Sequence, residues 1–137
     1  MNSEDKGMYS PTPIAVAAYE QVGIKTEIDD ASPHRIIQLM MERALVKIGI
    51  ARSQMNDGNV AEKGANISDA ISIINGLQAS LNHKADERMS ENFDALYAYM
   101  MKRLLEANLR DDESILEEVA GLLRELKEAW DAIVDEV

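Results

Sequence analysis

Beyond Pro33 the chain contains no further proline, and its apolar residues recur at intervals of three and four positions. Proline interrupts helices because its ring removes a backbone hydrogen bond and clashes with the preceding turn, so this part of the chain can be mostly helical. A spacing of three and four is typical of a helix with one buried face, whereas a half-buried strand alternates every second residue. The pattern predicts an all-α protein.

Local start and stop signals divide this region into four helices. Ser32-Pro33 predicts a firm start, because serine caps a free amide and proline needs no amide partner in the first turn. Asp57-Gly58 predicts an end, and Asn59 with Glu62 predicts a reciprocal cap for the next helix. The polar joint of residues 83–87 precedes the third predicted helix, and the pair Asp111-Asp112 begins the fourth. The predicted helices cover about residues 33–55, 59–82, 86–109 and 112–137.

Joints this short favour sequential helices that are antiparallel neighbours. We therefore expect an antiparallel four-helix bundle formed by residues 32–137. Residues 1–31 are expected to form an N-terminal arm, in which Ile14–Val22 can make two turns of a short helix.

The charge balance excludes several classes of protein. The chain of 137 residues has a formal net charge of -11, which opposes binding to nucleic acid or anionic lipid. It has no cysteine, no apolar run of membrane-spanning length, and a polar start at Met1–Ser10 unlike a secretory signal. These features predict a soluble, cytoplasmic protein with no membrane insertion.

Catalytic groups are also missing from the pattern. The histidines are His34, in a first turn, and His83, in a predicted joint, and each is expected to be a solvated residue rather than a ligand or base. Phosphotransfer bundles need an exposed histidine in mid-helix, and di-iron bundles need Glu-x-x-His pairs. The sequence predicts no enzyme, no cofactor and no metal site.

The helix that begins at Pro33 carries more apolar surface than a peripheral helix needs. At about 100° per residue, one side holds its core residues, whereas Leu39, Val46 and Ile50 point the other way. Two explanations remain open. Either the protein needs no partner there, because the segment Ile14–Val22 folds back over these residues or isolated exposed apolar residues are tolerated, or a partner covers them. The core side comprises Ile37, Met40, Met41, Ala44, Ile48, Ala51 and Met55.

A broad apolar face also runs along residues 86–109, with Tyr99 opposite to it. Adjacent methionines occur at 40–41 and 100–101, and their flexible side chains adapt to irregular partners, although ordinary core packing also explains them. Surplus faces on two helices favour an apolar groove that receives an amphipathic segment of a partner. The face comprises Phe93, Leu96, Tyr97, Met100, Met101, Leu104 and Ala107.

Three stretches of the sequence carry a recognisable pattern. The first combines Tyr19-Glu20-Gln21 and Thr26 with the run from Ala31 to Met40, and the second is Glu91–Met100 continued by Arg103–Asn108. The third is Leu116–Leu126 with Ala129-Trp130. Together they cover about residues 9–134, and in residues, order and spacing they resemble the FliS family of flagellin export chaperones.

The resemblance implies a cytoplasmic chaperone that binds the disordered C-terminal segment of flagellin, prevents premature polymerisation and delivers flagellin to the flagellar type III export gate. It also implies an arm, with Tyr9 and Tyr19, that covers part of the client surface. Together with the surplus faces, it leads us to expect client contacts at Leu39, Met40, Val46, Ile50, Leu96, Tyr97, Tyr99, Met101 and Asn108.

The chain departs from the family pattern at Met41-Glu42-Arg43, where many members carry Tyr-Asp-Gly, and at Asp86-Glu87, where a Gly-Gly joint is usual. As an alternative function, a structural or signalling bundle would bury its surplus faces by dimerisation. For the chaperone we expect a monomer or a weak homodimer.

Most of the negative charge lies in the last helix. Residues 111–137 contain 10 acidic and 2 basic residues. Because its apolar stripe is broad and regular, the acids are expected to form the solvated back of a core helix. The client is therefore expected to bind elsewhere, around the helices that begin near Pro33 and Asp86.

Overall fold

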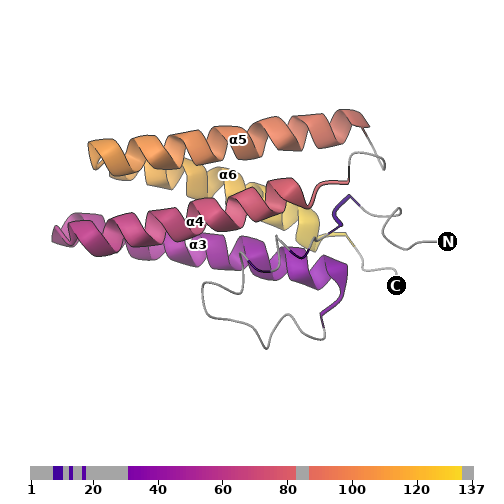
Figure 1. Ribbon diagram of the computed structural model, residues 1–137, viewed down its shortest axis with the longest axis horizontal. Helices are drawn as coiled ribbons and strands as arrows, with labels where there is room; N and C mark the ends of the chain where they lie inside the picture. The colour runs from indigo at the N-terminus through magenta and orange to yellow at the C-terminus, as the bar shows by residue number, and fades with distance from the viewer. Residues whose placement is uncertain (1–7, 11–12, 14–16, 18–30, 83–86, 134–137) are drawn as a thin grey trace.

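In a computed structural model, residues 8–10, 13, 17, 31–82 and 87–133 are placed well enough to describe. Successive helices run in opposite directions, and α3 and α5 each pack against both α4 and α6 (Figure 1). The expected all-α, antiparallel bundle is confirmed. Its helices are α3 (Pro33–Asp57), α4 (Val60–Ala79), α5 (Glu87–Arg110) and α6 (Glu113–Asp131).

The ends of α3 form as their sequence predicts. The backbone amide of Arg35 donates to the Ser32 hydroxyl at 3.1 Å, and Pro33 occupies the first helical position. At the other end Gly58 adopts a φ of 76°, and the amide of Asn59 donates to the Gln54 carbonyl at 2.9 Å. Glycine tolerates this left-handed backbone because it has no Cβ, so α3 stops there.

Three predicted helix features differ from the structure. Asn59 precedes α4, but its side chain makes no capping hydrogen bond. Helix α4 ends at Ala79 rather than near Asn82, because the backbone of residues 80–82 pairs with residues 8–10 instead of continuing the helix. The last helix ends at Asp131, so Ile133 lies beyond it and is half-exposed.

The core lies between the four helices. All seven residues predicted for the core side of α3 are buried or half-buried. Helix α6 buries Ile115, Leu116, Val119, Leu123 and Trp130. The large side chains that are essentially inaccessible to solvent are Tyr97, Ile37, Met40, Met41, Ile48, Ile67, Ile73, Ile74, Leu77, Met100 and Leu104.

A buried lysine ties the start of α4 to the end of α5. The ammonium of Lys63 donates to the Asn108 carbonyl at 3.1 Å and pairs with the Asp111 carboxylate. Asp111 has a φ of 50° and follows the last turn of α5. The positive charge therefore lies at the negative end of the α5 dipole, where it stabilises the free carbonyls.

Candidate functional site

At one end of the bundle, residues 8–10 pair with the chain that leaves α4. The amide of Ser10 donates to the Ser80 carbonyl at 2.6 Å, and the amide of Asn82 donates to the Met8 carbonyl at 2.6 Å. These two bonds form an antiparallel bridge between Tyr9 and Leu81. The bridge fixes the backbone of Tyr9 so that its side chain enters the bundle.

The Tyr9 ring is buried against side chains from two helices. Its hydroxyl hydrogen-bonds the buried hydroxyl of Tyr97 in α5, and its ring packs edge-on against Trp130 in α6 with centroids 5.0 Å apart. Burial raises the pKa of Tyr9 to about 12, although its hydrogen bond with Tyr97 partly offsets that rise. Burial and the nearby Tyr9 raise the pKa of Tyr97 well above its usual value. Both phenols are therefore neutral near pH 7.

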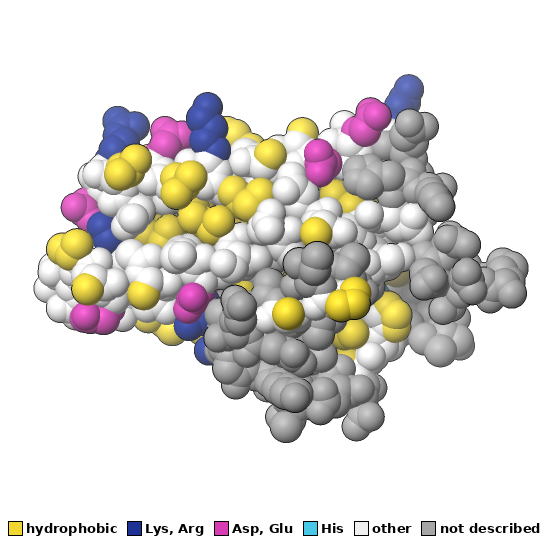
Figure 2. All heavy atoms as spheres, viewed as in Figure 1, with side chains coloured by type: hydrophobic (Ala, Val, Ile, Leu, Met, Phe, Trp, Pro, Cys, Tyr) yellow, Lys and Arg dark blue, Asp and Glu magenta, His cyan; other side chains and the backbone are white. Residues whose placement is uncertain are grey.

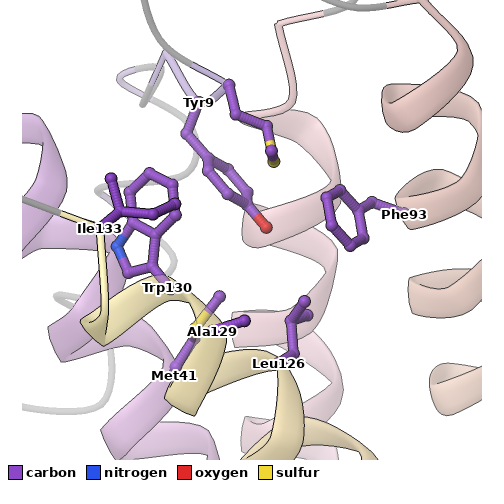
Figure 3. Close-up of a pocket in the computed structure, with 8 residues that line it drawn as sticks. Tyr9, Met41, Phe93, Leu126, Ala129, Trp130 and Ile133 are labelled. Carbon is purple, nitrogen blue, oxygen red and sulfur yellow. The ribbon is translucent and has the colours of Figure 1, made fainter.

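A small apolar hollow surrounds this contact. In Figure 3 the Tyr9 side chain extends between Trp130 and Phe93, from a different segment of the chain than either. Tyr9 thus fills part of an apolar opening at the end of the bundle. The residues lining the hollow are Met8, Tyr9, Met41, Phe93, Leu126, Ala129, Trp130 and Ile133.

His34 belongs to the same end of the bundle. Its ring stacks on Trp130 with centroids 4.6 Å apart, and the Trp130 indole N–H donates to the His34 carbonyl at 3.0 Å. His34 is half-buried rather than solvated as expected, because the indole covers one face of its ring. His83 lies outside the described residues.

A second apolar surface follows the line where α4 and α5 meet. Gln78 of α4 donates to the Asp94 carbonyl of α5, and Lys63 donates to the Asn108 carbonyl, so both ends of this line are fixed by contacts. Between these two contacts, the residues of α4 and α5 that face this line are largely apolar. One of them, Leu105, is 55% exposed. Figure 2 shows apolar side chains gathered between α5 and α4. We call this surface the α4–α5 strip: Gly64, Ile71, Ala98, Met101, Leu105 and the flanking Leu109, which lie over the buried Ile67.

The outer face of α3 is the third surface. Val46 and Ile50 are 45% and 40% exposed, as the helical spacing predicts. Leu39 lies on the same side of the helix by its position, but it is only 4% exposed. Leu39 is therefore covered in this structure whereas Val46 and Ile50 are open, because burial depends on what lies over each turn and not on the helical angle alone.

The edges where α6 meets α3 and where α6 meets α5 are polar by contrast. Arg52 of α3 pairs with Glu113 at 2.6 Å, and Lys127 lies 3.8 Å from Glu42. Between α5 and α6, the Tyr99 hydroxyl donates to Glu118 at 2.6 Å, and Arg103 pairs with the same carboxylate at 2.9 Å. These two bonds, Tyr99 first, lower the pKa of Glu118. Ion pairs and hydrogen bonds therefore bridge the edges of α6.

The nine expected contact residues do not form one surface. Val46 and Ile50 lie on the outer face of α3, Met101 and Asn108 lie along α4, and Tyr99 lies over α6. Leu96 is half-buried. The interior contains Leu39, Met40 and Tyr97, and of the two arm tyrosines Tyr9 contacts Tyr97 whereas Tyr19 lies outside the described residues.

Sequence reasoning missed the exposed leucines of α5. Leu109 is 83% exposed, and Leu105 and Leu109 were not among the residues expected at a surface. Their signal was the run of Ala98, Met101 and Leu105 at intervals of three and four, which forms a second stripe beside the core stripe of α5.

Comparison with known proteins decides the family. The family model described as "Flagellar protein FliS" matches residues 15–137. This chain belongs to the FliS family. A flagellar secretion chaperone FliSB of Pseudomonas aeruginosa is 44% identical over 119 residues, which cover 87% of this chain and 94% of the relative. The flagellar secretion chaperones FliS of Salmonella typhimurium and Escherichia coli are 41% and 40% identical, over 89% and 82% of this chain and 91% and 84% of their own lengths.

This FliS-family chain is therefore a flagellar export chaperone built on an all-α bundle. Within the described part of the chain, no helix combines the length and apolar character that crossing a membrane requires. The same residues contain no group of three or more side chains suited to hold a metal ion.

Proposed function

We propose that this chaperone binds the disordered C-terminal segment of flagellin in the cytoplasm, prevents its premature polymerisation and delivers it to the flagellar type III export gate. It does so without catalysing a reaction, as a monomer or weak homodimer whose bundle is formed by residues 32–137 and whose arm is formed by residues 1–31. The relatives named as flagellar secretion chaperones support an export substrate as the partner.

The observation that carries the proposal is the exposed apolar character of the α4–α5 strip. Leu105 and Leu109 leave large apolar areas in water at a helix pair that is otherwise well packed. Burying such side chains against a partner is favourable by about 25 cal/mol per Å² of apolar surface. A disordered client needs this gain because ordering its chain on binding costs conformational entropy.

The outer face of α3 extends the proposed contact area. Val46 and Ile50 are exposed one turn apart, and the adjacent Gly49 has no atom near enough to crowd an added side chain. The polar edges of α6 are a poor site for an apolar client, since binding there would desolvate Glu113 and Glu118.

The proposed arm acts by competition. Tyr9 contacts Tyr97, which is one of the expected client residues. If the client uses this end of the bundle, residues 8–10 must leave it first, and the apparent affinity falls by the fraction of molecules in which the arm is bound. Tyr19, the second proposed arm residue, lies outside the described residues.

Calorimetry with a peptide of the cognate flagellin C-terminal segment tests the proposal. We expect binding by the wild-type chain and a loss of about tenfold or more in Leu105→Glu, because a carboxylate would be desolvated at the contact. Ala132→Glu is the matched control, since Ala132 is exposed at the end of α6. Absence of binding by the wild type, together with tight self-association in sedimentation, would support the dimeric bundle instead.

A further inference from the structure

The site that Tyr9 fills is formed by three helices, whereas Tyr9 itself belongs to none of the four. Figure 3 shows Met41, Phe93 and Trp130, from α3, α5 and α6, around the Tyr9 ring. The Tyr9 side chain is therefore held as a ligand would be, in a surface that a separate segment of the chain enters. We call this surface the Tyr9 socket: Met41, Phe93, Tyr97, Leu126 and Trp130.

The Tyr9 socket matches a phenol better than a plain benzene ring. The Tyr9 and Trp130 rings meet at an interplanar angle of 81°, an edge-to-face arrangement that aromatic pairs favour. The hydroxyl of the fully buried Tyr97 shares a hydrogen bond with the Tyr9 hydroxyl. A buried hydroxyl that loses its partner is costly, so a ring without a polar tip fits less well. The socket therefore selects an aromatic ring that ends in a hydrogen-bonding group.

Backbone groups beside the socket fix the direction of the segment that carries the ring. Ser80 follows the last turn of α4, where helix carbonyls lack partners within the helix, and its carbonyl accepts from the Ser10 amide at 2.6 Å. Two residues later, the Asn82 amide donates to the Met8 carbonyl at 2.6 Å. Such bonds recognise an extended backbone and do not depend on its flanking side chains. An extended segment with a central tyrosine, and a free amide after it, can make the same contacts.

We propose that the Tyr9 socket and the backbone of residues 80–82 form a binding site for a tyrosine carried on an extended segment of another protein. Residues 8–10 are the built-in occupant of this site and show the chemistry that it accepts. The inference goes beyond the proposed function, because it concerns a second kind of ligand, bound at the end of the bundle. Apolar contacts with the ring supply most of the affinity, and the Tyr97 hydroxyl supplies the selectivity for tyrosine over phenylalanine.

A partner enters this site by exchange with the arm. The ring burial and the hydrogen bonds that residues 8–10 give up are formed again by the partner. Because the arm is part of the same chain, its effective concentration at the socket is high, and the partner has to compete with it. The apparent affinity of the partner falls by the fraction of molecules in which the arm is bound.

Two small probes test the selectivity of the socket. Full-length Tyr9→Ala vacates it, and p-cresol and toluene have the shapes of the tyrosine and phenylalanine side chains. Trp130 is the one tryptophan of the chain and lines the socket, so its fluorescence reports occupancy. We expect saturable binding of p-cresol to Tyr9→Ala, about threefold to tenfold tighter than that of toluene, the scale of one hydrogen bond. Tyr99→Ala is the matched control, because it removes an exposed tyrosine and leaves the socket filled, so it should give no saturable response.

A peptide of residues 7–12 tests the backbone contacts. We expect it to bind Tyr9→Ala, and its Tyr9→Phe form to bind about threefold to tenfold more weakly. A peptide with N-methylated Ser10 lacks the amide that the Ser80 carbonyl accepts and is also expected to bind more weakly. The wild type should bind the peptide about tenfold more weakly or less, because its own arm competes. If Tyr9→Ala does not fold alone, recovery of its helical circular dichroism measures binding of each peptide.

Tyr97→Phe in the Tyr9→Ala chain removes the hydroxyl at the base of the socket, and we expect the preference for p-cresol over toluene to disappear. The proposal is overturned if both probes bind Tyr9→Ala equally, or if the preference survives Tyr97→Phe. Equal binding of the natural and N-methylated peptides overturns it as well. None of these measurements uses flagellin, so their outcome and the outcome of the flagellin titration are independent.

Discussion

The hydroxyl groups of Tyr9 and Tyr97 share a buried hydrogen bond, although these residues are 88 positions apart in the chain. The bond joins a segment that precedes the bundle to the middle of α5. Because the Tyr9 ring also packs on Trp130, one side chain connects the N-terminal segment to two helices. The end of the bundle is therefore completed by a residue that does not belong to any of its four helices.

The first prediction concerns the stability of this contact. Tyr9→Phe removes one hydroxyl and leaves the buried Tyr97 hydroxyl without that partner, so we expect the free energy of unfolding to fall by about 1–3 kcal/mol. Tyr99→Phe removes the same atom at a 42% exposed site and is expected to change it by less than about 0.5 kcal/mol. Urea denaturation measures both. Equal stability of Tyr9→Phe and the wild type would contradict a stabilising role for the bond.

The second prediction concerns the arm in client binding. Deleting residues 1–12 removes Tyr9, and we expect the affinity for the flagellin peptide to stay equal or to increase, because no arm has to be displaced. Deleting residues 1–7 retains the bridge of residues 8–10 and should leave the affinity unchanged. Calorimetry compares the three chains. A large loss in the 1–12 deletion would mean that the arm contacts the client directly.

The third prediction separates surface from core on α3. Val46→Glu and Ile50→Glu are expected to weaken client binding by about tenfold or more, with changes in unfolding free energy below about 1 kcal/mol. Leu39→Glu should instead destabilise the fold, because it places a carboxylate at a buried position. Peptide titration and urea denaturation of each variant test this. If Val46→Glu unfolds the protein, Val46 belongs to the core and its assignment to the surface is wrong.

The fourth prediction concerns the link between α4 and α5. Lys63→Met removes the hydrogen bond to the Asn108 carbonyl and the ion pair with Asp111. We expect a loss of about 1–3 kcal/mol in unfolding free energy. Asp111→Gly should cost less, because glycine relieves the left-handed backbone at φ 50° while removing only the ion pair. A thermal melt of Lys63→Met that matches the wild type would show that the link adds no stability.

The fifth prediction concerns acid sensitivity. Hydrogen bonds from Tyr99 and Arg103 lower the pKa of Glu118 from its ordinary 4.5. A carboxylate whose folded pKa is lowered stabilises the protein above the unfolded value and loses that contribution as pH falls through the folded pKa. The stability difference between the wild type and Glu118→Gln should therefore be largest above pH 4.5 and shrink below it. Urea denaturation at several pH values measures this difference, and a constant difference would contradict the assignment.

The sequence alone determined the features that depend on neighbouring residues. Ser32, Pro33 and Gly58 predicted both ends of α3, because caps and left-handed turns are formed within a few positions. The apolar spacing likewise predicted the core side of α3, and the short joints between helices predicted the antiparallel bundle. The family followed from three stretches of residues and was confirmed by comparison with known relatives.

Only the tertiary structure decided which apolar residues remain exposed. Helical spacing placed Leu39 with Val46 and Ile50, yet the fold buries the first and exposes the others. The α4–α5 strip arises from two helices at once, so neither pattern by itself indicated it. The position of Tyr9 depends on backbone pairing with residues 80–82, far away in the chain. Periodicity assigns a residue to a side of a helix, whereas burial depends on what the rest of the chain brings to that side.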